Sequence, residues 1–329
     1  MAQITSDLKP ATLGAAVRRH TILGLSRQEW RNQRNGLLFV APWLIGFLAF
    51  TFVPMASSLY FSFTSYNGLT AAHWVGLQNY GHILTTDPYI GTAVVNTLYL
   101  TALGVPLGTI AALGLALLLN QGVRGIGLYR TMYYLPSILP IVVSAFTFSI
   151  VLAPDDGPVN HLLALLHIPG PSWLYSADWS KPAMVLFGLW GLGNSMVIYL
   201  ASLHDVPQHL IDAAEIDGAG WWARLRHVTL PMISPVIFFN VVLAVIASFQ
   251  NFVAIFFLTS TAASGSSGGP AQSLLTWGLL IYNDAFVNGR LGYAAAMSWL
   301  MFIVVLFMTL LLFKIGSLFV YYEGGDDQR

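Results

Sequence analysis

Long apolar runs constrain this sequence more than any other feature. A helix rises about 1.5 Å per residue, so a hydrocarbon core of roughly 30 Å is crossed by about 20 apolar residues. We therefore expect an all-α, polytopic membrane protein with six transmembrane helices. The six runs are Leu37–Phe63, Ala93–Leu119, Thr131–Leu152, Ala183–Leu203, Val236–Leu258 and Tyr293–Phe319.

Charge is scarce throughout the chain. Only 9% of its 329 residues are charged, whereas a soluble domain carries roughly 25%. Water cannot solvate a surface built from so few charges, which excludes a soluble globular enzyme. The formal net charge of zero gives no reason to expect a nucleic-acid partner. The absence of cysteine excludes disulfides, thiolate metal sites and cysteine nucleophiles.

The basic residues predict the orientation, because cytoplasmic connections are enriched in Lys and Arg. The first 36 residues carry six of them: Lys9, Arg18, Arg19, Arg27, Arg31 and Arg34. With that tail cytoplasmic, the basic residues of segments 120–130 and 204–235 fall on the same side, as do Lys314 and Arg329. Only Lys181 and Arg290 fall on the other side. The pattern predicts cytoplasmic tails at 1–36 and 323–329 that flank a six-helix domain, residues 37–322.

The N-terminal tail is too short to bury a core of its own. Ile22, Leu25 and Trp30 alternate with Arg27, Arg31 and Arg34. This pattern favours an interfacial amphipathic helix that leads into the first span, although a basic tail that only sets the orientation is compatible with it.

The central parts of the six spans contain no ionisable residue. A proton-driven carrier, a voltage sensor and an acid/base or metal-dependent membrane enzyme all need such residues there. The polar side chains present are amides and hydroxyls, which suit a neutral, hydroxyl-rich solute or simple helix–helix hydrogen bonds. They are Asn96, Thr97, Ser144, Asn194, Ser195, Asn240, Ser248, Gln250, Asn251 and Ser298.

The segment 205–235, DVPQHLIDAAEIDGAGWWARLRHVTLPMISP, lies between the fourth and fifth spans. Its pattern predicts two short helices on the membrane surface. Asp205 is placed to cap the first helix, and Gly218 to end it in the left-handed conformation. Helical spacing places His209, Asp212 and Glu215 on one face and Leu210, Ala213 and Asp217 on another. Pro231 and Pro235 would end the segment before the fifth span.

At this point the sequence resembles a known family. Residues 212–220, DAAEIDGAG, followed by Leu230 and Pro231, are similar to the E-A-A…G…L-P loop of permease subunits in binding-protein-dependent ATP-driven (ABC) importers. Asp212 stands where the family usually has Glu. The stretches Trp74–Tyr80, Gly268–Pro270 and Gly292–Ser298 resemble the carbohydrate-type branch, which includes maltose, lactose and glycerol-3-phosphate importer permeases.

The resemblance implies the type I importer permease fold and a multi-pass location in the bacterial cytoplasmic (inner) membrane. It also implies four kinds of partner: a second homologous permease, two ATP-binding subunits, an extracytoplasmic solute-binding protein and a sugar-like substrate. The chain itself would be non-catalytic and would hold no cofactor, because ATP and Mg bind to the ATPase subunits. The helix within loop 204–235 would be the coupling helix that docks on the ATPase, with Asp212, Ala213, Ala214, Glu215, Asp217 and Gly218 as its coupling residues.

The resemblance also points to a substrate pathway between the fourth and fifth spans. Counting from the loop without gaps, five residues fall on the sugar-facing positions of maltose-type permeases: Trp190, Gly191, Asn194, Ser248 and Asn251. Gly191 and Asn251 match the family's residue type, whereas the other three do not. We expect Asn194, Ser248 and Asn251 to hydrogen-bond hydroxyls and Trp190 to stack on a sugar ring, although lining of the helix bundle is the alternative. No basic residue falls in this pathway, which disfavours a phosphorylated solute.

Two other classes remain for comparison. A self-sufficient secondary carrier would need an ion-coupling site; a sodium site built of carbonyls and hydroxyls would leave no ionisable residue to find. A polytopic membrane enzyme would need convergent nucleophiles, acids or metal ligands. The chain has no P-loop sequence, so uphill transport requires energy from another subunit.

Overall fold

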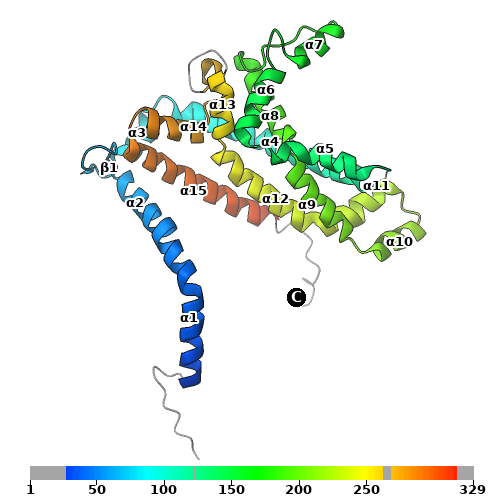
Figure 1. The fold of residues 1–329 in the computed structure, drawn as a ribbon, viewed down its shortest axis with the longest axis horizontal. Coiled ribbons are helices and arrows are strands. Elements are labelled where there is room, and N and C mark those ends of the chain that lie inside the picture. Colours follow the sequence, from blue (N-terminus) through cyan, green and yellow to red (C-terminus); the bar gives the residue numbers. More distant parts are fainter. Residues whose placement is uncertain (1–26, 122–123, 262–267, 317–329) are drawn as a thin grey trace, which may run out of the picture. The chain divides into compact units, whose positions relative to one another are not determined.

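The computed structural model describes residues 27–121, 124–261 and 268–316. The chain divides into two compact units, 1–57 and 58–329. Most of the described residues are helical, and Figure 1 labels the elements along the chain. Both sites described below lie within the second unit.

The first helical run is longer than expected. It comprises α1 (Arg27–Phe47), a π-helical turn (Leu48–Phe52) and α2 (Val53–Ser62), and its apolar part, Trp30–Ser62, is long enough to cross a membrane. Trp30 and Arg34 of the predicted interfacial helix lie in α1, with the guanidinium of Arg34 5.4 Å from the Trp30 ring centroid. Ile22 and Leu25 lie outside the described residues, as do the C-terminal residues 317–329.

A small hairpin and a short helix follow. Strand β1 (Thr64–Ser65) pairs antiparallel with β2 (His73–Trp74), with Thr64 opposite Trp74. Helix α3 (Gln78–Thr85) leads to α4 (Ile90–Leu119), which is the second predicted span. The last described helix, α15 (Leu291–Gly316), corresponds to the sixth span.

The third predicted span is not straight. It consists of α5 (Ile126–Ile138) and α6 (Ile141–Val151), which meet at an angle of 104°. The break falls at Leu139, which is extended (φ −66°, ψ 138°) and precedes Pro140. Proline disfavours the helical conformation of the residue before it. The expectation of one continuous helix over Thr131–Leu152 was therefore wrong.

The fourth predicted span is also broken. Helices α8 (Ala177–Trp190) and α9 (Gly193–His204) meet at 49° across Gly191 and Leu192. By length and composition, four helical runs of the described chain can cross a membrane. The described chain reaches the predicted six when each bent pair is taken as one span.

The fifth span begins earlier than expected. Helix α11 (Trp221–Arg224), a π-helical turn (Leu225–Thr229) and α12 (Leu230–Gln250) form one run that can span a membrane. Pro231 follows the π-helical turn directly and does not interrupt the run. The expectation that Trp221–Pro235 would form a separate surface helix was therefore wrong. The run ends at the extended residue Asn251, and α13 (Val253–Thr261) follows.

Shorter elements connect the remaining spans. These are α7 (Pro158–Leu165), a 3₁₀ turn (Pro270–Gln272), α14 (Trp277–Tyr282) and a π-helical turn (Asn283–Val287). Two side chains of α4 hold the connection before α14. Asn96 Nδ2 donates to the carbonyls of Gln272 (2.9 Å) and Leu275 (3.0 Å), and Thr97 Oγ1 accepts from the Trp277 amide at 2.9 Å.

Small residues let the helices of the second unit pack closely. Ala112 and Ala116 of α4 are fully buried against Met196 and Tyr199 of α9, in a cluster that also includes Ile233 of α12. Large apolar side chains such as Ile110 on α4 point outward instead. Buried small residues and exposed large ones are what helices packed within lipid require.

Candidate functional site

Helix α10 (Gln208–Ile216) occupies the loop in which the sequence predicts the coupling helix. It begins after Pro207 without a side-chain cap, and Asp205 instead ends α9, so Asp205 is not the predicted N-cap. Gly218 follows α10 with φ +80°, the left-handed conformation that ends many helices. A Cβ built on Gly218 meets nothing within 4 Å.

The burial pattern divides α10 into an inner and an outer face. Leu210, Ile211 and Ala214 are half-buried, and Ile211 packs against the cluster that contains Tyr199. The opposite, exposed face is formed by four residues: His209, Asp212, Ala213 and Ile216. We call these four residues the α10 outer face. Ile216, which sequence reasoning missed, is 87% exposed, and it adds an apolar centre to this face.

Two polar contacts fix the sides of α10. The Glu215 carboxylate pairs with Arg224 of α11 at 2.6 Å. Gln208 Nε2 donates to Asp212 Oδ1 at 2.9 Å. Asp217 caps the C-terminal end and is exposed. Of the six predicted coupling residues, only Ala214 is turned partly inward, and the other five are exposed.

A cavity of about 630 Å³ lies between α4, α8, α9, α12 and the start of α13. We call it the bundle cavity. Its volume falls within the range of roughly 300–1,000 Å³ that small-molecule sites occupy. None of the residues that line it is Lys, Arg, Asp or Glu, and its polar side chains are Thr109, Ser195, Tyr199, Asn240, Ser248, Gln250 and Asn251.

The structure brings three of the five predicted pathway residues to this cavity. Gly191, Ser248 and Asn251 line it, whereas Trp190 and Asn194 are not among its lining residues. Trp190 is the last residue of α8, and its ring packs edge-on against Phe148 at 6.3 Å. Asn194 is exposed in the first turn of α9. These two residues lie on either side of the bend between α8 and α9.

Hydrogen bonds orient part of the cavity lining. Ser248 Oγ lies 2.8 Å from Thr101 Oγ1 of α4, and Tyr199 and Thr109 also line the cavity. Tyr199, Thr101 and Thr109 were missed at the sequence level, because hydroxyls on an apolar helix give no signal of the direction they face. Asn96 and Thr97 instead hold the connection before α14, as described above.

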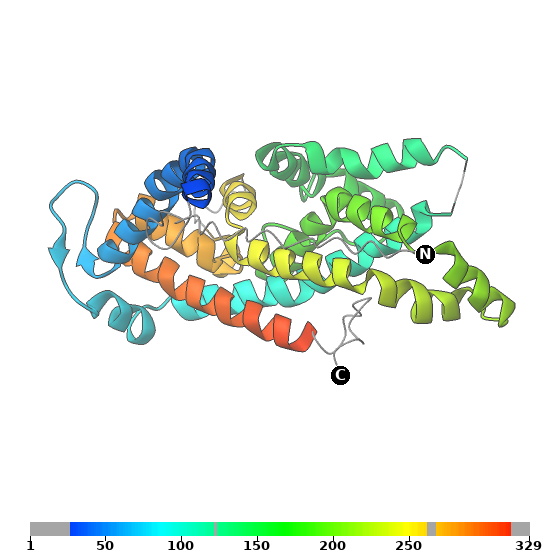
Figure 2. The same ribbon diagram turned by 90° about the horizontal axis from the view of Figure 1, so that it is seen from below.

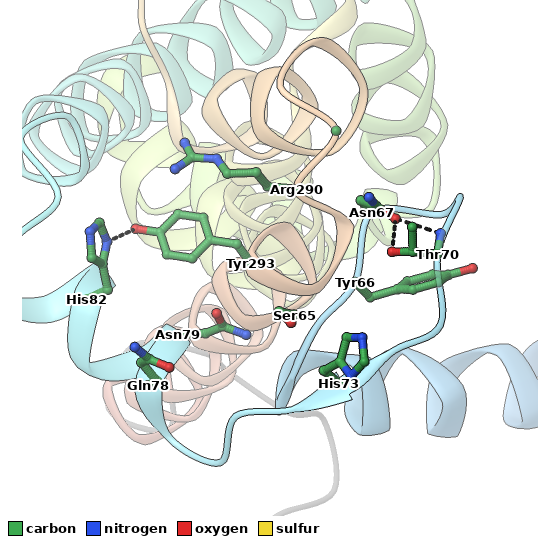
Figure 3. A pocket seen from close by; sticks show the side chains of 11 residues that line it. Ser65, Tyr66, Asn67, Thr70, His73, Gln78, Asn79, His82, Arg290 and Tyr293 are labelled. Atoms are coloured by element: carbon green, nitrogen blue, oxygen red, sulfur yellow. Dashed lines mark hydrogen bonds between the residues drawn. The ribbon is translucent and has the colours of Figure 1, made fainter.

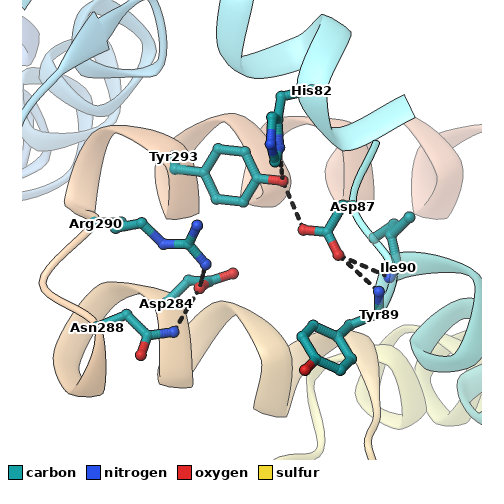
Figure 4. Close-up of polar contacts among 8 residues, drawn as sticks. All are labelled: His82, Asp87, Tyr89, Ile90, Asp284, Asn288, Arg290 and Tyr293. Atoms are coloured by element: carbon teal, nitrogen blue, oxygen red, sulfur yellow. Dashed lines mark hydrogen bonds and ion pairs between the residues drawn. The ribbon is translucent and has the colours of Figure 1, made fainter. Parts of the chain in front are cut away.

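Ionisable side chains gather elsewhere, where α3, the start of α4, the π-helical turn after α14 and the start of α15 meet (Figure 4). The Tyr293 hydroxyl donates to Asp87 Oδ2 at 2.6 Å and lies 3.1 Å from His82 Nδ1. Asp284, which is 1% exposed, pairs with Arg290. Asp87 Oδ1 accepts from the Tyr89 and Ile90 amides that begin α4. Because Arg290 and Asp284 form an ion pair, their charges compensate each other.

Comparisons with known proteins show which family this chain belongs to. Residues 104–322 match the family described as binding-protein-dependent transport system inner membrane component. The chain is 36% identical over 306 residues to the probable ABC transporter permease protein YesP of Bacillus subtilis (strain 168), covering 92% of this chain and 96% of that protein. It is 33% identical to the lactose transport system permease protein LacF of Rhizobium radiobacter, covering 85% of this chain and 93% of LacF.

One solved structure shares the fold across most of the chain. It is the crystal structure of a bacterial ABC transporter involved in the import of the acidic polysaccharide alginate, matched with a TM-score of 0.75 and 23% identity. The match covers 88% of this chain and 98% of the other. The family match and the relatives confirm the predicted family, and the protein is a multi-pass membrane permease. The chain belongs to the family of binding-protein-dependent transport system inner membrane components, the permeases of ABC importers.

Proposed function

We propose that this chain is one of two permease subunits that form the pathway for a neutral sugar or other polyhydroxy solute. An extracytoplasmic binding protein delivers the solute, and two ATPase subunits drive the movement. Both chain termini lie in the cytoplasm. Relatives of this chain serve lactose, trehalose/maltose and sn-glycerol-3-phosphate transport systems. Its substrate therefore falls among the neutral polyhydroxy compounds of this range.

The uncharged bundle cavity is the observation that carries the proposal. Amides and hydroxyls on a rigid scaffold donate to and accept from sugar hydroxyls without charge, as specific recognition of a neutral solute requires. Asn251 is the extended residue at which α12 ends, and it lines the cavity. A phosphate group would enter this cavity without a cationic partner at a large desolvation cost.

The α10 outer face supports the coupling role. An exposed isoleucine beside small and acidic residues, on a helix that packs inward through its other face, suits docking on a separate subunit. Closure of the ATPase subunits on ATP would move α10 and, through the continuous run that begins at Trp221, the helices around the cavity. Alternating access of this kind needs two packings of similar free energy and no covalent chemistry.

Uptake by reconstituted transporter tests the pathway. The complete complex, placed in vesicles with ATP inside, is supplied with labelled lactose, trehalose or maltose and with its binding protein. We expect Asn251→Ala to lower uptake of the transported sugar about tenfold, because one or two hydrogen bonds are lost at about 1 kcal/mol each. Asn194→Ala is the matched control, since this exposed amide lies outside the cavity lining. Unchanged uptake in Asn251→Ala would contradict the assigned pathway.

The secondary carrier is the competing function. It predicts uptake that depends on a sodium gradient and proceeds without ATP. Family membership favours the importer, and the same vesicles separate the two functions when ATP or sodium is omitted.

A further inference from the structure

The β1–β2 hairpin and α3 lie at the end of the second unit opposite α10 (Figures 1 and 2), and they border a second pocket. Its walls are the β1–β2 hairpin, α3 and the start of α15, and its volume is about 380 Å³. We call it the hairpin pocket. Because the positive-inside pattern predicts that α10 is cytoplasmic, this pocket is predicted to open to the external side.

The walls of the hairpin pocket are held by the fold itself. Asn79 Nδ2 of α3 donates to the carbonyls of Ser62 (2.9 Å) and Thr64 (3.0 Å), which joins α3 to the hairpin. The Gly292 amide of α15 donates to the Tyr66 carbonyl at 2.9 Å. A Cβ on Gly292 would lie 2.2 Å from the Thr64 carbonyl, so only glycine permits this approach. A preformed pocket loses little entropy when a ligand binds.

The hairpin loop is shaped in the same way. Asn67 Oδ1 accepts from the amides of Leu69 (3.0 Å) and Thr70 (2.9 Å) and from the Thr70 hydroxyl. The Tyr66 ring stacks on Phe61 with centroids 4.4 Å apart. Figure 3 shows the side chains of the hairpin on one side of the pocket and those of α3 on the other, with Tyr293 and Arg290 between them.

Several polar groups in this pocket have no partner among the described residues. The side chains of Ser65, His73 and Gln78 line the pocket and are exposed, and none of them has a hydrogen bond within the described part of the chain. These groups supply a hydroxyl, an imidazole and an amide. Together they can donate to and accept from several ligand hydroxyls.

The charge of the pocket is already balanced. Arg290 is the one lysine, arginine or carboxylate side chain among the lining residues, and it pairs with the buried carboxylate of Asp284. Its guanidinium also lies 4.9 Å from the Tyr293 ring centroid. An anionic ligand would have to compete with Asp284, whereas a neutral, hydroxyl-bearing ligand would not.

We propose that the hairpin pocket is a second saccharide site, separate from the bundle cavity, which binds one neutral sugar unit on the external side. This inference rests on the proposed function, because it takes the solute to be a sugar. The recognising groups are Ser65, His73 and Gln78, with the ring of Tyr66 as an apolar surface. The site binds weakly, since it is open and shallow, and it holds sugar near the permease before transfer to the pathway.

Site-resolved photolabelling tests the proposal. The complete transporter, without its binding protein, is irradiated with a diazirine derivative of each disaccharide used in the uptake assay, and the labelled peptides are mapped by mass spectrometry. We expect label on peptides that contain residues 64–82 and 289–293, competed by the unmodified disaccharide. The double variant His73→Ala/Gln78→Ala should reduce this label about tenfold, as the loss of two hydrogen bonds requires.

Control variants separate specific binding in the hairpin pocket from nonspecific labelling of its surface. Leu69→Ala changes a hairpin side chain that is 93% exposed and does not line the pocket, so its label should equal that of the wild type. Asn251→Ala should leave the hairpin label unchanged. Label confined to peptides of the bundle cavity, or hairpin label that neither competition nor the double variant reduces, would overturn the second site and leave the proposed function standing.

Two further outcomes are also decisive. A double variant that loses stimulation of ATP hydrolysis by the binding protein, while the wild type shows no competed label at the hairpin, would assign the pocket to protein docking and overturn the saccharide site. Absence of both uptake and label for every disaccharide would contradict the proposed function itself.

Discussion

At the scale of single residues, two glycines of the bent fourth span have opposite surroundings. Gly188 of α8 lines the bundle cavity, and a Cβ there meets nothing within 4 Å. Gly193 of α9 is buried, and a Cβ there would lie 2.6 Å from Ser137 Oγ and 2.8 Å from Tyr134 Cα. The first glycine leaves space for solute, whereas the second allows α9 to approach α5.

This difference predicts that substitution of Gly188 impairs uptake without lowering stability, whereas substitution of Gly193 lowers stability. Gly188→Leu should leave the melting temperature of the detergent-solubilised complex unchanged or slightly raised, because leucine favours a helix by up to about 1 kcal/mol over glycine. It should abolish most uptake, since its side chain fills the cavity. Gly193→Ala should instead lower the melting temperature, because overpacking costs about 1–3 kcal/mol. Normal uptake by Gly188→Leu would show that solute does not pass this point.

At the scale of the element, α10 separates its structural face from its exposed face. The inner residues pack against the bundle, so changes there affect folding and coupling together. The α10 outer face can be changed with little effect on the fold, because exposed positions usually tolerate substitution within about 0.5 kcal/mol.

Ile216→Asp tests this face directly. We expect normal amounts of permease in the membrane and loss of co-purifying ATPase, because a charge replaces the exposed apolar centre of the docking surface. Gln208→Ala, at the edge of the same helix, serves as the control and should retain the ATPase. Retention of the ATPase by Ile216→Asp would place the docking surface elsewhere.

Substitutions of Gly218 give a second test of the docking role of α10. Two variants separate the effect of backbone strain from that of side-chain bulk. Alanine there introduces only the left-handed backbone penalty of about 1–2 kcal/mol, whereas tryptophan adds bulk in open space beside α10. We expect Gly218→Trp to uncouple ATP hydrolysis from uptake and Gly218→Ala to impair it less. Coupled transport at wild-type rates in Gly218→Trp would contradict a docking role for this loop.

At the scale of the whole molecule, the bundle cavity is lined by one chain alone, and the proposed pathway needs a second permease to enclose it. Purification of the tagged chain from its native membrane, followed by mass spectrometry, should therefore recover a P-loop ATPase and a second homologous permease. A monomer or homo-oligomer without ATPase would contradict the importer. Sodium-dependent uptake would then be the next measurement.

The fold class, the approximate number and order of the spans and the family were all predicted correctly from the sequence. These features follow from run length, charge and local motifs, which are all properties of neighbouring residues. It also anticipated the left-handed Gly218, because a glycine after a short helical pattern is a local signal.

Only the tertiary structure decided which polar side chains share a site. Trp190 and Asn194, on either side of the bend between α8 and α9, lie outside the cavity lining, whereas Tyr199 and Asn240 lie within it. The ten polar residues of the spans look alike in sequence, yet Asn96 and Thr97 hold a connection and Ser248 and Asn251 face the cavity. Helical periodicity gives the relative angle of residues within one straight helix. It contains no information about the neighbour that each face meets, and that depends on packing between segments distant in the chain.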